Sequence, residues 1–235
     1  MKAVDSLEIV VLVDNVTDSL SSNPPFVETE FAWLRKHGMK WLSGQCLCCA
    51  AHGLSCLITV KSGGGSRTLL FDTGPDEWVF ERNATRLGVD LGAVEAMVLS
   101  HGHWDHGAGM PRALQMVTQG NGGKSIPVYL HPEMFALRAT KAKDGTLLPM
   151  ELVPGVDVLT GNGGNVVLTR EAQSVLGDAF HVSGEIPRAT PFERGFPGQV
   201  RQKPDGSWEP DEIMPDERFV AVNVAGKGLV VFTAC

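Results

Sequence analysis

Short apolar runs recur along the chain and predict a protein rich in β-strands. Their length and β-branched content are typical of strands, and they lie at residues 7–13, 54–60, 67–71, 94–99, 126–130, 166–169 and 228–233. The sequence SGGGS at 62–66 separates two of these runs, which favours a hairpin. Residues 75–87 begin with Pro75 and two acidic residues and stop near Gly88, as a helix does, and residues 107–118 are a second helical candidate. Strands and helices therefore alternate in the first half, as in an α/β fold.

The remainder of the chain gives fewer signals. Residues 141–215 are rich in Gly, Pro and Asn, and we find no internal repeat and no domain boundary. A chain of 235 residues can bury a substantial core, so we expect one domain over residues 1–235. The last run, in AGKGLVVFTAC, is apolar enough for a central strand, yet the sequence stops at its end. We therefore expect this chain to be a C-terminally truncated piece of a longer protein.

Charge and composition narrow the class of protein. Twenty Lys and Arg against 27 Asp and Glu give a net charge of −7, and no basic run suited to a nucleic-acid backbone is present, so we expect no nucleic-acid partner. The first apolar run is too short to span a membrane, and no cleavage site follows it. We expect a cytoplasmic protein with no membrane partner; its oligomeric state is not predicted.

The five cysteines form a poor disulfide framework. Four of them lie between positions 46 and 56, without a CxxC spacing or a second pair downstream, and the set comprises Cys46, Cys48, Cys49, Cys56 and Cys235. We expect reduced buried or loop thiols, with a metal or redox role as the less favoured alternative.

The stretch SHGHWDHG at 100–107 carries the strongest chemical signal, because it follows an apolar run directly. His101 and His103 lie two positions apart at a strand end, where both can reach one ion. Asp105 and His106 lie further round the turn, where they can reach a second ion. Imidazole nitrogen and carboxylate oxygen are ordinary zinc ligands. A polar loop of surface histidines is the alternative, but imidazoles crowded without an ion repel one another once protonated.

We therefore predict two divalent metal ions, with zinc preferred and with manganese or iron suited to the same ligands. A metal-bound water loses its proton near neutral pH, so the pair would deliver hydroxide to an ester or phosphoester-like bond. Asp105 would hold the second ion and the nucleophile together, which makes it catalytic as well as a ligand. The sequence thus predicts a metal-dependent hydrolase acting on a small molecule, with phosphorylated compounds among the candidates. The sequence contains no serine nucleophile elbow, Walker loop or dinucleotide fingerprint that would indicate a different chemistry.

The stretch SHGHWDHGAG, preceded by LLFDTG at 69–74, resembles the metallo-β-lactamase superfamily. The resemblance implies a four-layer αββα sandwich, here without its C-terminal part, and a dinuclear metal site at the strand ends. It also implies that Asp72 supports the metal loop from outside the ligand set. A turn role for Asp72 before Gly74 is the simpler alternative, and the two are compatible.

A narrower resemblance extends over nearly the whole chain. The segments DNVTD, AAHGLSCLI, SGEIPRATPFE and DEIMPDERFVAVNVAGKGLVVFTAC are similar to a branch named dihydropterin-methyl-ribofuranosylaminobenzene phosphate synthase or metal-dependent hydrolase. This branch implies a transferase as the alternative activity. Its last matching strand continues into a Cys-Ser-His motif, and a Gly-Gly-Phe-His motif that contributes the last histidine follows later. The Ser-His of the first motif and the whole second motif are absent here. The ligand set is therefore incomplete, which keeps a metal-binding but inactive fragment as a third alternative.

Three further histidines lie outside the metal loop and are candidates for ligand, pocket or structural roles. His181 lies where many relatives of the wider superfamily place a third histidine ligand, although the narrower branch does not require one. His52 is a candidate for lining the pocket. His131 ends a strand before Pro132, which favours a capping or packing role.

Four other polar residues are candidates for contact with ligand or substrate. Asp14 and Asn15 follow the first predicted strand, where a turn role is equally plausible. Glu185 and Arg188 lie in the stretch GEIPR. The planar guanidinium of Arg188 suits a phosphate or carboxylate, and a surface ion pair is the alternative.

Overall fold

A computed structural model describes residues 1–18, 20–193 and 195–234; the prediction for Cys235 lies outside them. Its largest sheet has six strands in the order β2-β3-β4-β5-β6-β9, namely β2 (Ser6–Val13), β3 (Ser55–Ser62), β4 (Gly65–Phe71), β5 (Val94–Val98), β6 (Ile126–Leu130) and β9 (Gly164–Leu168). The first three strands are antiparallel, and β4, β5, β6 and β9 run parallel. Six of the seven expected strands, and the expected hairpin, are therefore in this sheet.

A second sheet packs on the first. It has the order β1-β14-β11-β10, with β15 also paired to β14, and contains β1 (Ala3–Val4), β10 (Gln173–Val175), β11 (Phe180–Val182), β14 (Val220–Val224) and β15 (Gly228–Phe232). Only β15 was expected from its apolar run. The two sheets share a core in which Leu69 and Phe71 of β4 contact this second sheet, while Leu70 faces the opposite way. This alternation is what a strand buried on both faces requires.

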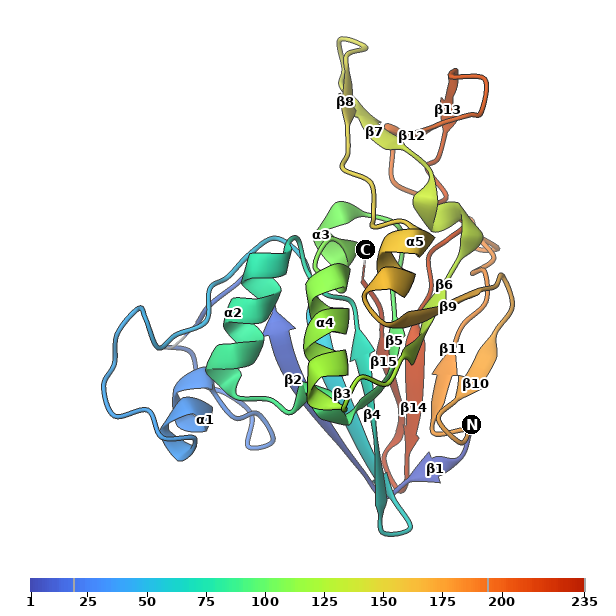
Figure 1. Cartoon of the computed structure of the whole chain (residues 1–235). Coiled ribbons are helices and arrows are strands. Elements are labelled where there is room, and N and C mark those ends of the chain that lie inside the picture. Colours follow the sequence, from blue (N-terminus) through green and yellow to red (C-terminus); the bar gives the residue numbers. More distant parts are fainter. Residues whose placement is uncertain (19, 194, 235) are drawn as a thin grey trace.

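Helices cover the other face of the six-stranded sheet (Figure 1). They are α2 (Glu77–Leu87), α4 (Met110–Gly120) and α5 (Val156–Gly161), with α1 (Glu30–Lys36) beside α2 and the short α3 (Trp104–Gly107) at the sheet edge. The side chain of Asp76 caps α2 by accepting from Val79 N at 2.7 Å, and Gly88 ends this helix with a left-handed φ of 63°. Two 3-10 turns cover Leu91–Ala93 and Pro132–Phe135.

The layers are thus helix, sheet and sheet. The αββα arrangement implied by the resemblance has a further helical layer on the outer face of the second sheet, and the described residues do not form one (Figure 1). Among these residues no helix has the length and apolar character needed to cross a bilayer.

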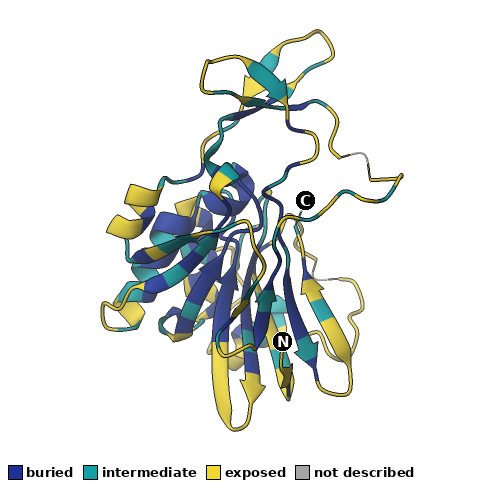
Figure 2. Cartoon of the chain, turned by 90° about the vertical axis from the view of Figure 1, so that its right-hand side faces the viewer, coloured by how far each residue is buried: buried dark blue, intermediate teal, exposed yellow. Residues whose placement is uncertain are grey.

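A third, small sheet projects from this body (Figure 1). Its order is β13-β12-β7-β8, with β7 (Arg138–Lys141), β8 (Leu147–Pro149), β12 (Gln199–Gln202) and β13 (Trp208–Pro210). Figure 2 shows that buried positions concentrate in the two main sheets, whereas the tips of the third sheet are exposed. The sequence did not predict these strands, because short exposed strands lack the apolar runs by which strands are recognised.

Candidate metal site

The histidine loop lies at the carboxyl end of β5, between this strand and α4. Its four candidate ligands are buried, with exposed fractions of 1% for His101, 9% for His103, 6% for Asp105 and 5% for His106. The parallel neighbour β4 ends at the same edge of the sheet, because Phe71 is in register with Val98. A buried polar loop thus sits where two central strands end together.

Two pairs of potential ligand atoms face each other in this loop. His101 Nε2 lies 3.0 Å from His103 Nδ1, and Asp105 Oδ2 lies 3.3 Å from His106 Nε2. The ligand-to-ligand distance in a tetrahedral zinc shell with bonds near 2.0–2.1 Å is about 3.3 Å. Each pair therefore has the spacing of two ligands on one ion. Within the described residues, no three His, Cys, Asp or Glu side chains already form a shell, so each pair supplies part of one.

Asp72 supports the loop from the end of β4. Its carboxylate is 1% exposed and accepts three hydrogen bonds, from Ser100 N at 2.7 Å, Ser100 Oγ at 2.8 Å and His106 Nδ1 at 2.8 Å. Because His106 donates through Nδ1, its Nε2, which faces Asp105 Oδ2, is the ring nitrogen left to bind an ion. Ser100 gives its only hydroxyl proton to Asp72, so its oxygen accepts from His101 Nδ1 at 2.9 Å and leaves the His101 Nε2 lone pair for an ion.

The environment keeps these groups in their metal-binding protonation states. Burial, followed by the charges of His106, His103 and Arg138, holds the pKa of His101 well below its usual value. Burial and then Arg138 lower the pKa of His103 to about 4. Burial alone would raise the pKa of Asp105, but the hydrogen bond and charge of His106 outweigh it and lower that pKa. At neutral pH His101 and His103 are therefore neutral imidazoles and Asp105 is a carboxylate, which are the forms that bind a divalent cation.

Comparison with known proteins agrees with this geometry. A model of the metallo-β-lactamase superfamily matches residues 53–115, a range that includes Asp72 and the histidine loop. The crystal structure of a metal-dependent hydrolase of the β-lactamase superfamily aligns with a TM-score of 0.62 and 21% identity, covering 98% of this chain and 66% of that one. The chain has the metallo-β-lactamase fold. The resemblance seen in the sequence, and the fold class that it implied, are confirmed.

One curated relative matches most of this chain, which has the metallo-β-lactamase fold. The 7,8-dihydropterin-6-methyl-4-(β-D-ribofuranosyl)-aminobenzene-5'-phosphate synthase of Methanocaldococcus jannaschii is 28% identical over 189 residues, which are 78% of this chain and 60% of that protein. The chain therefore spans about 60% of the length of this relative.

His52 is the candidate outside the loop that comes nearest to it. Its Nε2 lies 3.4 Å from Asp105 Oδ2 and its ring centroid 6.0 Å from that of Trp104, while its side chain is exposed. Asp14 and Asn15 are exposed after β2, and the Asp14 carbonyl accepts from Ala51 N at 3.0 Å. The structure thus brings His52 to the site and places Asp14 beside it through the backbone.

The structure does not bring His181 to the loop. It lies on β11 between Phe180 and Val182, which both point into the core between the two sheets. Because side chains alternate along a strand, the imidazole of His181 points to the outer face of the second sheet. The candidate position taken from wider relatives is therefore turned away from the site here.

Glu185 and Arg188 are committed to protein partners. Glu185 accepts from His131 Nε2 at 3.0 Å and pairs with Arg170. Arg188 pairs with Glu217 and donates to the carbonyl of Ile213, which matches the ion-pair alternative for this residue.

The nature of His131 is also settled by its contacts. Its Nδ1 accepts from Glu133 N at 3.1 Å, and the side chain is fully buried. This is the capping and packing role expected from its position before Pro132.

Two residues that touch the loop were not identified as site residues from the sequence. Arg138 donates to the carbonyl of Gly102 at 3.1 Å, and Asp216 accepts from the Gly102 amide at 2.8 Å. They lie 36 and 114 positions from Gly102, so no local spacing connects them with it. An arginine within the apolar stretch FALRAT was the only hint.

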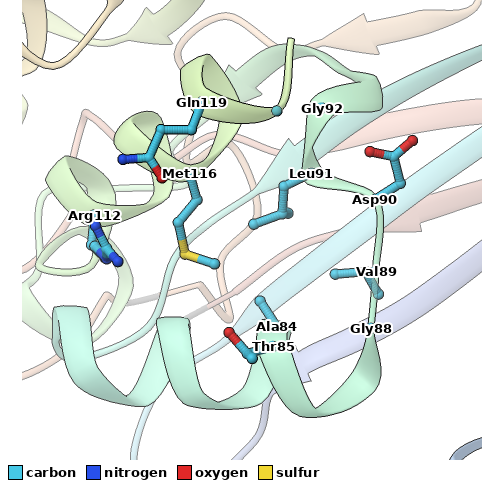
Figure 3. A pocket seen from close by; sticks show the side chains of 11 residues that line it. Ala84, Thr85, Gly88, Val89, Asp90, Leu91, Gly92, Arg112, Met116 and Gln119 are labelled. Carbon is cyan, nitrogen blue, oxygen red and sulfur yellow. The ribbon is translucent and has the colours of Figure 1, made fainter. Parts of the chain in front are cut away.

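A cavity of about 420 Å³ lies elsewhere, between the end of α2 and α4 (Figure 3). Asp90, Leu91 and Gly92 line it just before β5 begins, whereas the histidine loop follows the end of that strand. The cavity is therefore at the opposite edge of the sheet and is separate from the metal site.

Proposed function

We propose that the chain is a metal-dependent hydrolase in which His101 and His103 bind one divalent ion and Asp105 and His106 bind a second. The observation that carries the proposal is the spacing of the two pairs of ligand atoms, 3.0 and 3.3 Å. The buried network around Asp72 supports it, because it engages Nδ1 of His101 and of His106 and leaves Nε2 of each ring facing another candidate ligand. Zinc is the preferred ion, and manganese and iron suit the same ligands.

The chain's own groups then have distinct tasks. When bound, divalent ions supply a water of lowered pKa and polarise the bond under attack. Asp105 Oδ2, lying between His106 Nε2 and His52 Nε2 at 3.3 and 3.4 Å, is placed to hold a proton during the reaction. The exposed imidazole of His52 is placed to pass that proton to solvent. Asp72 and Ser100 keep the histidine rings fixed, so little reorganisation is needed.

A transferase is the second candidate, and the 28% identity to the synthase favours it. In that case the substrates would be a phosphorylated arylamine and a compound that donates a dihydropterin-methyl group. In either case the partner is a small molecule, and we expect a cytoplasmic location. The same two ligand pairs would serve both reactions, so activity has to distinguish them.

The test compares the wild-type chain with His103→Ala. Elemental analysis after loading with zinc or manganese should give up to two ions for the wild type and at least one fewer for the variant. Hydrolysis of a panel of phosphate esters, lactones and thioesters should fall at least about 100-fold, as expected when metal assistance is lost. His37→Ala is the control, because His37 is exposed at the end of α1, and it should retain both properties.

Equal hydrolysis by the wild type and His103→Ala would reject the hydrolase. Formation of the coupled pterin product without hydrolysis would establish the transferase. Stoichiometric metal without turnover of either kind would indicate the metal-binding but inactive chain.

A further inference from the structure

A buried cluster of three charged residues lies directly against the histidine loop. Arg138 is 2% exposed, Asp211 2% and Asp216 0%. The guanidinium donates from Nε to Asp211 Oδ2 and from Nη2 to Asp216 Oδ1, both at 2.8 Å. Arg138 begins β7 and Asp211 directly follows β13, so the cluster ties the base of the third sheet to the body of the protein.

The same cluster holds Gly102 from both sides. The Gly102 amide donates to Asp216 Oδ2 at 2.8 Å, and Arg138 Nη1 donates to the Gly102 carbonyl at 3.1 Å. The bond between Arg138 and Asp216 closes the ring. Gly102 separates His101 from His103, so fixing its amide and its carbonyl fixes the peptide planes on both sides. The backbone spacing of His101 and His103 is thus held by groups that form no hydrogen bond to either ring.

The packing around Gly102 is built for this contact. A Cβ atom at this position would lie 2.3 Å from Met134 O and 2.6 Å from Arg138 Nη1, so only glycine lets the guanidinium reach the backbone. A buried arginine is costly unless all its donors are paired. Arg138 meets this need with two carboxylates and with the carbonyls of Gly102 and Glu133. A lysine has one charged centre and cannot span these acceptors.

We propose that Arg138 and Asp216 are positioning residues that preset the spacing of His101 and His103, and with it the metal affinity of the loop. The proposal rests on the metal-binding role given above. It makes the third sheet, through its first residue, part of the machinery that shapes the metal site.

The first test measures zinc affinity by competition with a chromophoric chelator. The conditions are ones in which circular dichroism shows each variant to be folded. Arg138→Lys keeps the positive charge and loses the planar guanidinium that donates to two carboxylates at once. Asp216→Asn keeps the shape but turns an amide NH2 toward one of its two donors. Loss of groups that orient metal ligands weakens binding by about 10- to 100-fold, and we expect this loss in both variants.

The matched control is Arg218→Lys. Arg218 is equally buried, at 0% exposed, but its guanidinium donates to the carbonyls of Ser183 and Glu171. This substitution should lower the stability of the fold. Zinc affinity should stay within about threefold of the wild-type value, since the ligand-orienting contacts remain. Wild-type affinity in Arg138→Lys and Asp216→Asn, or an equal loss in Arg218→Lys, would overturn the proposal.

A second measurement needs no metal and separates this proposal from the proposed function. Amide hydrogen exchange in the metal-free chain should show the Gly102 amide protected, with exchange at least about tenfold faster in Asp216→Asn and unchanged in Arg218→Lys. Protection without zinc binding by the wild type would reject the metal-binding function and keep the structural clamp. An unprotected Gly102 amide would reject the clamp whatever the metal does.

Discussion

Two charged clusters meet near residue 133, and they differ in burial. Beneath the histidine loop lie the buried cluster of Arg138, Asp211 and Asp216 and, at the end of β4, the separate carboxylate of Asp72, all with exposed fractions between 0 and 2%. On the surface, Arg170 joins Glu133 and Glu185, and these three side chains are between 30 and 48% exposed. Both clusters connect segments distant in the sequence, and both are fully paired in the structure.

The difference shows that the number of ion pairs does not rank their importance. A buried polar group that loses its partner cannot turn to water, so the whole desolvation cost is felt. An exposed pair loses little, because water and salt already screen it. We therefore expect changes in the buried cluster to affect both folding and metal binding, and changes in the surface cluster to affect neither strongly.

The largest effect is expected for Asp72→Ala. This change leaves the Ser100 amide, the Ser100 hydroxyl and His106 Nδ1 without their acceptor, in a site that is 1% exposed. At about 1–3 kcal/mol for each of the three unsatisfied buried groups, the free energy of unfolding should fall by at least about 3 kcal/mol. Urea denaturation of the metal-free chain measures it.

Asp178→Ala is the control that isolates the backbone. Asp72 and Asp178 have left-handed φ angles of 57° and 69°, which alanine tolerates less well than aspartate. The Asp178 side chain is 51% exposed and its one ion pair, with Lys2, is open to solvent, so its replacement should cost little beyond the backbone part. Equal losses in the two variants would mean that the hydrogen bonds of Asp72 contribute nothing.

A lower pH should next destabilise the buried site around the histidine loop. The pKa of His103 is about 4 in the folded chain and 6.5 for a free histidine, so the unfolded state binds more protons between these values. Stability contributed by neutral His103 is therefore complete above about pH 6.5 and is lost as the pH falls toward 4. Between about pH 7 and pH 4.5 this loss amounts to roughly 2 to 3 kcal/mol.

The measurement is urea denaturation of the metal-free chain at several pH values, for the wild type and for His103→Gln. The variant should show a flatter dependence on pH by about that amount. If both curves have the same slope, the buried imidazole is not responsible for the acid sensitivity.

The sequence predicted those parts of the fold and site that are encoded locally. The histidine loop is a run of ligand types at a strand end, and the long strands of the six-stranded sheet are continuous apolar runs. The hairpin at 62–66 and the helix ending at Gly88 follow from turn and capping residues. In each case the neighbours in sequence are also the neighbours in space.

The sequence did not predict what long-range packing creates. Arg138 and Asp216 meet at Gly102 only because the third sheet folds back on the body, and β14, with the sequence VAVNV, became a core strand through its partners β11 and β15. His181 was placed by analogy with wider relatives, but the alternation of β11 turns it outward. A single position carries no information about such register.

The smallest effect is expected for Arg170→Gln on the surface. Arg170 pairs with Glu133 and Glu185 in a cluster open to solvent, and isolated exposed pairs contribute little to stability. The melting temperature should change by no more than about 2 °C, and zinc affinity should stay at the wild-type value. The difference should shrink further in about 1 M salt, where the Debye length is about 3 Å. Calorimetry at low and high salt measures this change in melting temperature.

A loss of stability that matches that of Asp72→Ala and persists at high salt would show that the surface cluster acts as a rigid network. The contrast between buried and exposed charge would then not hold for this protein.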